Sequence, residues 1–260
     1  MSKTVLVTGA CINTGVAIVE KFAKEGYNVI FTGRNSEKVA EKEKEYKQKF
    51  TSVEFWGYSI DSLTDEGTVD EESVERMFSD IDKKGLFVET LVLNAADQGL
   101  GQKIFENPLN DLMKVINTNV VWNYCLSEYA ARRMKEQGGG NIIFINSNTA
   151  YRAIPDRIAY VASKGGQLGL MRALALDLGK YNIRVNAVLP GMIKTDRWEK
   201  NPDFYKDVPS RFTPIGDVAV GEDVADAVYY FAAHARNTTG AELVVDGGNT
   251  IQLYPIIPKQ

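Results

Sequence analysis

Residues 4–15 read TVLVTGACINTG, and this stretch decides the fold. The β-branched run Thr4–Thr8 is typical of a buried strand, and the glycines after it predict a turn that opens a helix. Such a turn lets backbone amides and the helix N-terminus approach a pyrophosphate, although a plain strand-to-helix turn is the alternative. We expect dinucleotide contacts from Gly9, Asn13, Thr14 and Gly15. Asn13 stands where a further glycine is common, and asparagine tolerates positive φ better than other side chains.

The same alternation of β-branched runs and longer amphipathic stretches continues along the chain, which predicts βαβ units and a parallel sheet. The expected strands are Thr4–Thr8, Asn28–Thr32, Val53–Tyr58, Thr90–Leu93, Asn141–Asn146, Ile183–Leu189 and Glu242–Val245. The expected helices are Gly15–Glu25, Glu37–Phe50, Glu71–Lys83, Pro108–Gln137, Ile158–Leu178 and Glu222–Ala235. No linker or repeat divides the chain, so residues 1–260 are predicted to form one doubly wound, Rossmann-type α/β domain.

Two stretches break this rhythm. Residues 62–74 are acidic and longer than a typical connection, which indicates a surface excursion. Residues 192–216 lack a clean period and contain three prolines and several aromatic residues, so we expect an irregular substrate-binding loop or lid there.

Composition excludes several classes of function. A net charge of −4 gives no electrostatic footprint for nucleic acid or an anionic membrane. Two cysteines make no disulfide framework, no Cys/His spacing predicts a metal site, and the single histidine, His234, is interpreted as structural. Without a signal peptide or a long apolar run, we expect a cytoplasmic protein.

The end of the second strand bears on the choice of cofactor. An NAD enzyme usually has an acidic residue there for the ribose 2′-hydroxyl, whereas this chain has Gly33 followed by Arg34. A guanidinium can pair with a 2′-phosphate, so we expect NADP(H) to be preferred over NAD(H). The alternatives are that Arg34 is a solvated turn residue or stacks on adenine.

Tyr160 and Lys164 lie four residues apart, so a helix places both side chains on one face. The ammonium charge is expected to lower the pKa of the phenol, which would let Tyr160 exchange a proton with an alcohol oxygen near neutral pH. Ser147, upstream of the pair, can hold that oxygen by a hydrogen bond.

Together these residues resemble the short-chain dehydrogenase/reductase family, and the match spans nearly the whole chain in order. The family's motifs correspond to Thr8–Gly15, Asp61, Asn94-Ala95-Ala96, Asn119, Ser147, Tyr160, Lys164, Pro190–Thr195, Thr239-Gly240 and Val245–Gly248. The departures are Asn13 in the glycine turn and alanine in place of glycine at Ala96.

The resemblance implies a seven-stranded parallel sheet, a small-molecule substrate and a homotetramer or homodimer in which Pro108–Gln137 and Ile158–Leu178 pack on a neighbouring subunit. It implies that Asp61 lies on the adenine side of the cofactor and that Asn94 and Ala95 also bind the cofactor. It also implies that Pro190, Gly191, Ile193 and Thr195 lie at the nicotinamide, with the threonine on its carboxamide.

The resemblance further implies reversible hydride transfer between a nicotinamide and a carbinol carbon. Tyr160 would be the general acid or base and Ser147 would orient the substrate oxygen. Lys164 would hold the nicotinamide ribose, and Asn119 would anchor a water that links Lys164 to solvent. Three rivals remain: a halohydrin-cleaving branch, which uses arginine at the lysine position, an enoyl-thioester reductase, which spaces tyrosine and lysine more widely, and a non-catalytic dinucleotide sensor.

The substrate pocket is expected to involve Ser147, Thr149, Ile154, Tyr160 and Trp198. The tail at 251–258 is unusually apolar, and it either packs on a neighbouring subunit or closes the pocket. An apolar, aromatic-rimmed pocket favours a bulky ketone or alcohol such as a hydroxysteroid, ahead of a 3-oxoacyl thioester and then a sugar or polyol.

Overall fold

The computed structural model describes residues 3–101, 103–106 and 109–256. Seven strands form one sheet in which every neighbouring pair is parallel, in the order β3-β2-β1-β4-β5-β6-β7. The strands are β1 (Thr4–Val7), β2 (Asn28–Gly33), β3 (Phe55–Ser59), β4 (Val88–Leu93), β5 (Gly140–Ile145), β6 (Ile183–Pro190) and β7 (Glu242–Val245). The predicted doubly wound parallel sheet is confirmed.

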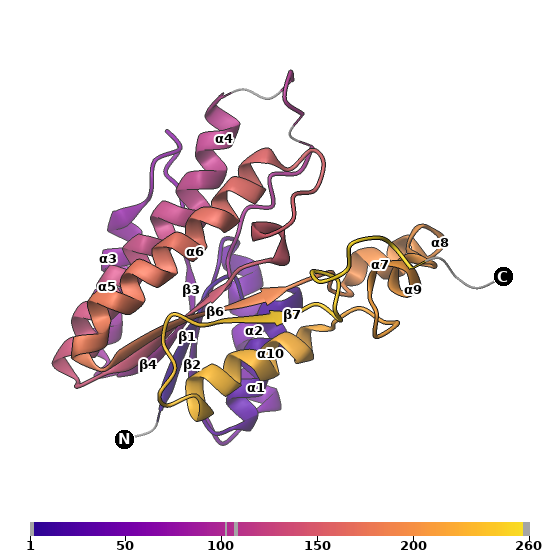
Figure 1. The fold of residues 1–260 in the computed structure, drawn as a ribbon. Coiled ribbons are helices and arrows are strands. Elements are labelled where there is room, and N and C mark those ends of the chain that lie inside the picture. Colours follow the sequence, from indigo (N-terminus) through magenta and orange to yellow (C-terminus); the bar gives the residue numbers. More distant parts are fainter. Residues whose placement is uncertain (1–2, 102, 107–108, 257–260) are drawn as a thin grey trace.

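Two helical layers cover the sheet (Figure 1). The first consists of α1 (Asn13–Lys24), α2 (Ser36–Lys49) and α10 (Gly221–Tyr229), which continues into a π-helical turn, η4 (Tyr230–His234). The second consists of α3 (Glu71–Lys83), α4 (Leu109–Ile116), α5 (Trp122–Glu136) and α6 (Ile158–Leu178). Because both faces of the sheet are covered, the central strands are buried along their whole length, as their β-branched sequences require.

The long helix predicted over Pro108–Gln137 is interrupted. A π-helical segment, η1 (Asn117–Val121), joins α4 to α5, and Pro108 lies outside the described residues. The extra residue per turn brings Asn119 inward, where its side-chain amide binds both the N–H and the C=O of Asp97 at 2.7 and 2.8 Å. Such π-bulges are frequent at functional sites.

The stretch 192–216 is more regular than its sequence predicts. It contains three short helices, α7 (Asp196–Lys200), α8 (Pro202–Tyr205) and α9 (Val208–Phe212), which project from the carboxyl edge of the sheet (Figure 1). Pro202 and Pro209 stand in the first turns of α8 and α9, where a proline has no N–H to lose and has the φ that a helix needs. The prolines therefore start helices here and do not mark an irregular loop.

Two features lie at the carboxyl edge of the sheet. These are η2 (Asn148–Ala150) after β5 and the acidic connection between β3 and α3, in which Leu63 and Val69 form an isolated bridge. At the opposite edge, η3 (Gly179–Tyr181) joins α6 to β6.

Candidate active site

The glycine turn has the backbone conformation that its sequence predicts. Gly9 has a φ of +64° and Asn13 a φ of +49°, and α1 begins at Asn13 with no acidic residue in its first turn. A Cβ on Gly9 would lie 2.8 Å from the Cα of Ala95, and one on Gly15 would lie 2.5 Å from the carbonyl oxygen of Gly9. Side chains are therefore excluded at these two positions, and the close backbone with the helix N-terminus, including Thr14, fits a pyrophosphate.

Asn94 holds this turn in place. Its side-chain Nδ2 donates to the carbonyl oxygens of Thr8 and Gly9 at 2.9 and 3.0 Å, and the backbone N–H groups of Asn94 and Ala95 donate to the Thr8 hydroxyl at 3.0 Å. Tyr46, which sequence reasoning missed, adds a second tie from its buried hydroxyl to the carbonyl oxygen of Ala10 at 3.0 Å. These residues shape the cofactor cradle through the backbone.

Basic side chains lie near the turn and the end of β2, where the adenosine of the cofactor is expected. Arg34 is exposed after β2, and helix α2 begins immediately beyond it with Asn35 as its cap. Burial raises the pKa of the Cys11 thiol, and the charges of Lys42 and Lys38 partly oppose this, which places both lysines within electrostatic range of the turn. Asp61 is exposed, and its carboxylate accepts the backbone N–H groups of Ser62 and Leu63 at 2.7 and 3.4 Å.

The predicted catalytic residues converge at the carboxyl end of β5. Ser147 follows this strand, and its hydroxyl lies close enough to Tyr160 on α6 to lower the pKa of the phenol. The Lys164 Nζ lies one helical turn further, 5.5 Å from the centroid of the Tyr160 ring. Asn119, in the π-helical segment, reaches the same group because its Nδ2 donates to the Ser163 hydroxyl at 2.9 Å.

Lys164 is only 1% exposed. Its Nζ donates to the carbonyl oxygen of Ile145 at 2.9 Å and to the Oε1 of Gln167 at 3.0 Å. Burial lowers the pKa of Lys164 to about 7, so the ammonium and the neutral amine are close in free energy near neutral pH.

In the protein alone, the pKa of Tyr160 lies above its ordinary value and does not reach the neutral range expected from its pairing with Lys164. Burial raises the pKa of Tyr160, against the opposing effects of the hydrogen bond with Ser147 and the charge of Arg157. The reason is that both members of the pair are desolvated, which favours the neutral forms of the phenol and of the amine alike.

The residues expected at the nicotinamide follow β6, where this strand leaves the sheet. Gly191, next to Pro190, donates its N–H to the carbonyl oxygen of Val245 at 3.0 Å, and a Cβ there would lie 2.6 Å from the Cβ of Asp246. Ile193 bridges to Ala219, and Thr195 precedes α7 without capping it through its side chain. The Thr195 hydroxyl is thus not used by the helix that it precedes.

The expected substrate residues surround Ser147 unevenly. The buried Thr149 hydroxyl has no hydrogen-bond partner among the described residues, although the Thr149 backbone N–H donates to the Ser147 Oγ at 3.2 Å. Ile154 is exposed, and Trp198 stacks on Tyr205 with ring centroids 4.3 Å apart. The side chain of Phe204, and Ile257 and Pro258 of the tail, lie outside the described part of the chain.

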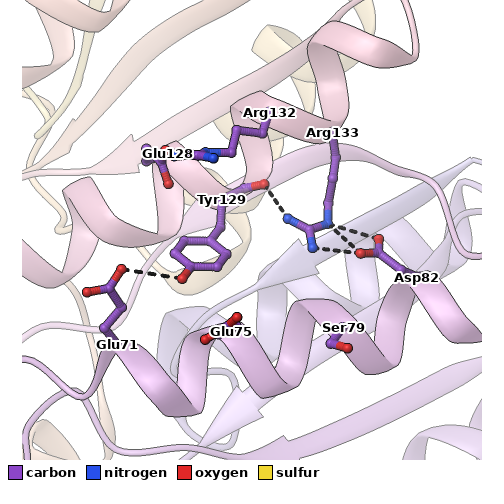
Figure 2. Close-up of a pocket in the computed structure, with 8 residues that line it drawn as sticks. All are labelled: Glu71, Glu75, Ser79, Asp82, Glu128, Tyr129, Arg132 and Arg133. Atoms are coloured by element: carbon purple, nitrogen blue, oxygen red, sulfur yellow. Dashed lines mark hydrogen bonds and ion pairs between the residues drawn. The ribbon is translucent and has the colours of Figure 1, made fainter.

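A second polar region lies between α3 and α5 (Figure 2). It is a hollow of about 380 Å³ lined by Glu71, Glu75, Ser79, Asp82, Glu128, Tyr129, Arg132 and Arg133. None of the predicted site residues lines it. Over residues 3–101, 103–106 and 109–256, no group of three or more His, Cys, Asp or Glu side chains is arranged to hold a metal ion, and no helix is long and apolar enough to cross a membrane.

Comparisons with known proteins agree with this geometry. Residues 9–250 match the family model described as enoyl-(acyl carrier protein) reductase. A 3α-hydroxysteroid dehydrogenase of Mediterraneibacter gnavus is 32% identical over 249 residues, which are 95% of this chain and 96% of that protein. A 3-oxoacyl-acyl-carrier-protein reductase of Rickettsia bellii is 31% identical over 249 residues, with 95% of this chain and 96% of that protein covered.

Among solved structures, ElxO with NADP bound superposes with a TM-score of 0.85 at 32% identity, covering 97% of this chain and 100% of that one. The full-length match, the seven-stranded sheet and the glycine turn all agree with one assignment. The chain belongs to the short-chain dehydrogenase/reductase family and is an NAD(P)-dependent oxidoreductase.

Proposed function

We propose that this protein interconverts a secondary alcohol and a ketone, with NADP(H) as the preferred cofactor and Tyr160 as the general acid or base. The observation that carries the proposal is the convergence of Ser147, Tyr160 and the buried Lys164 at the carboxyl edge of the sheet, with the Lys164 Nζ 5.5 Å from the centroid of the Tyr160 ring. Ligands of open parallel sheets bind at this edge.

Each residue has a role that its position supports. The bound nicotinamide would supply or accept the hydride. Ser147 would hold the substrate oxygen, and Tyr160 would donate its proton to that oxygen in reduction and remove it in oxidation. Lys164 would stabilise the phenolate, and Gly191, Ile193 and Thr195 would position the carboxamide.

The preference for NADP(H) rests on the charge around the adenosine end. Arg34 is exposed, and Lys38 and Lys42 stand on the adjoining helix. A 2′-phosphate would form charge-assisted hydrogen bonds with these groups, whereas a 2′-hydroxyl finds no acidic partner at Gly33. The similar structure with NADP bound supports the same choice.

For the substrate we propose a bulky apolar ketone or alcohol such as a hydroxysteroid. Ile154 and Trp198 supply apolar surface in segments that follow the carboxyl ends of β5 and β6, and the buried Thr149 hydroxyl is available for a polar group of the ligand. The similarity to a 3α-hydroxysteroid dehydrogenase favours this class. A 3-oxoacyl thioester is the second candidate, favoured by the similarity to the Rickettsia bellii reductase.

An enoyl-thioester substrate fits less well despite the description of the matching family model. The four-residue spacing places the Tyr160 and Lys164 side chains on one face of α6, whereas an enoyl-thioester reductase spaces these two residues more widely. A non-catalytic dinucleotide sensor would keep the cradle but would need none of the Ser147, Tyr160 and Lys164 contacts.

We also propose a homotetramer or homodimer. Val121 and Tyr124 on the η1–α5 helix and Leu176 on α6 are apolar side chains left exposed, Leu176 by 83%. A neighbouring copy that packs on these helices would bury them.

The test is a spectrophotometric screen in both directions with NADPH and NADH against steroid ketones, acetoacetyl thioesters and small ketones. We expect turnover of a steroid ketone with NADPH that is lost in Tyr160→Phe and retained in Tyr230→Phe, a matched change at an exposed tyrosine. Cofactor binding without turnover of any substrate would favour the sensor instead.

A further inference from the structure

Gln167 lies one turn beyond Lys164 on α6 and is fully buried, with 0% of its surface exposed. A buried amide must satisfy a carbonyl oxygen and two N–H groups inside the protein. The Oε1 of Gln167 accepts from Lys164 Nζ at 3.0 Å and from Asn146 Nδ2 at 3.1 Å, and its Nε2 donates to the carbonyl oxygen of Asn119 at 2.6 Å.

The orientation of this amide follows from a backbone donor. The Ser147 N–H donates to the Oδ1 of Asn146 at 2.7 Å, so the Nδ2 of Asn146 faces the other way, toward the carbonyl oxygen of Lys164 and toward Gln167. An N–H group at that position requires the oxygen of Gln167 opposite it. The nitrogen of Gln167 is therefore left for Asn119, and a flipped amide would lose all three contacts.

This arrangement fixes where the lysine stands. The carbonyl oxygen of Ile145 and the Oε1 of Gln167 both accept from the Lys164 ammonium, which has three N–H groups in all. Both acceptors stabilise the charged form against the desolvation that opposes it. One N–H then remains for Tyr160 or a cofactor hydroxyl.

We propose that Gln167 is a positioning residue for Lys164. Its amide holds the ammonium beside β5 and links it to the carbonyl oxygen of Asn119, a link that the family resemblance assigns to a water molecule. The inference rests on the proposed catalytic role of Lys164. A water in this position could exchange and reorient, whereas the amide is covalently part of α6. The distance between Asn119 and Lys164 is therefore set by a side chain of α6 and not by an exchangeable water.

Few charged side chains on the surrounding elements can compete with Gln167 for the Lys164 ammonium. Strand β5 and the π-helical segment carry no titratable side chain, and η2 carries none. Asp111 and Lys114 of α4 and Arg184 of β6 belong to elements that pack on α6, but burial alone accounts for the lowered pKa of Lys164. The nearby titratable group is Tyr160, which itself feels the charge of Arg157.

The first test uses Gln167→Met, which keeps the volume of the side chain and removes the amide, with Leu168→Met as the control at the next buried position of α6. Loss of an acceptor disfavours the ammonium, so the phenolate of Tyr160 loses support. We expect kcat of alcohol oxidation to fall about 10- to 100-fold, the size of one hydrogen bond to a charged group, with the substrate KM nearly unchanged. The rise of the rate with pH should move to higher pH by about one unit.

Gln167→Glu keeps an oxygen against Lys164 and should bring the pH profile back toward that of the unsubstituted protein. A folded Gln167→Met protein with an unchanged pH profile would overturn the proposal, and so would an equal shift in Leu168→Met. Either result would mean that Gln167 only packs in the core and does not position Lys164.

The second test does not depend on turnover. Unfolding by urea is measured for Lys164→Met, Gln167→Met and the double variant. If Gln167 acts through Lys164, the second substitution should add little to the first, whereas additive losses of stability would contradict the coupling. Failure of the proposed function would appear instead as turnover that survives Tyr160→Phe, with the coupling in unfolding unaffected.

Discussion

The protein has one polar cluster inside the fold and another at its surface. Close to Tyr160, Lys164, Gln167 and Asn146 are buried, and one set of hydrogen bonds joins them. In the hollow between α3 and α5, Arg133 binds both carboxylate oxygens of Asp82, and Tyr129 donates to Glu71 at 3.3 Å, with side chains open to solvent (Figure 2).

The difference shows what burial does to a polar group. In the hollow, water can replace a lost partner, so each ion pair contributes about 1 kcal/mol or less to the free energy of unfolding. Around Lys164, a lost partner leaves a desolvated group unpaired, so each contact affects both the position and the protonation of the lysine. The buried cluster is therefore where single substitutions should affect the chemistry most.

The largest effect is expected from Lys164→Met. Removing the ammonium leaves Tyr160 without the charge that supports its phenolate, so kcat should fall about 10²- to 10⁴-fold. Steady-state kinetics would measure this, with Lys180→Met as an exposed lysine control. A variant that keeps more than about a tenth of its activity would show that Lys164 is only structural.

Arg34→Ser should have the next largest effect. Loss of the guanidinium removes a charge-assisted contact with the 2′-phosphate, so the KM for NADPH should rise about 10- to 100-fold while that for NADH stays nearly constant. Arg76→Ser, on the exposed surface of α3, is the control. Equal changes in the KM values for NADPH and NADH would mean that Arg34 does not bind the 2′-phosphate.

The pH dependence of stability tests the buried cluster without any substrate. Between about pH 7 and 10.5, unfolded Lys164 carries a proton that the folded protein has released, so the free energy of unfolding should rise with pH across this window. Burial raises the pKa of Cys125 to about 11 and also raises the pKa values of Cys11 and Tyr46, which opposes the trend above about pH 8, so urea unfolding is best compared between about pH 7 and 8. The rise should be about 1 kcal/mol and vanish in Lys164→Met; persistence of the rise in that variant would assign it to another group.

Arg133→Met in the hollow should have the smallest effect. The methionine keeps the packing on Phe78, over which the guanidinium lies at 4.8 Å, and loses the ion pair with Asp82 and the hydrogen bond to the carbonyl oxygen of Tyr129 at 2.9 Å. Stability should fall by about 1 kcal/mol or less, with kcat unchanged. A loss of several kcal/mol, or of turnover, would show that the hollow does more than carry surface charge.

Sequence reasoning succeeded where a local pattern determines the structure. The strand β1 with its glycine turn, the positive φ of Asn13, and the meeting of Ser147, Tyr160 and Lys164 all follow from short motifs whose geometry is fixed by neighbouring residues. The helix ending at Gly138 was equally predictable, because a glycine there adopts a φ of +87°.

What escaped prediction depends on contacts between distant segments. The π-helical turn at Asn119 exists because its amide meets the backbone of Asp97, and the raised pKa of Tyr160 reflects burial rather than its distance in sequence from Lys164. Gln167 gave only a weak signal, as one polar residue among the small and apolar residues of YVASKGGQLGL at 160–170. Its partners on β5 and η1 appear only in the folded chain.

The central claim is that Tyr160 transfers the proton in a ketone reduction that consumes NADPH. The most direct measurement is single-turnover oxidation of bound NADPH by a steroid ketone in the unsubstituted protein and in Tyr160→Phe, with cofactor binding measured on the same samples. The account predicts equal binding of NADPH and a loss of at least about 10²-fold in rate for Tyr160→Phe. Equal binding with an undiminished rate would contradict it.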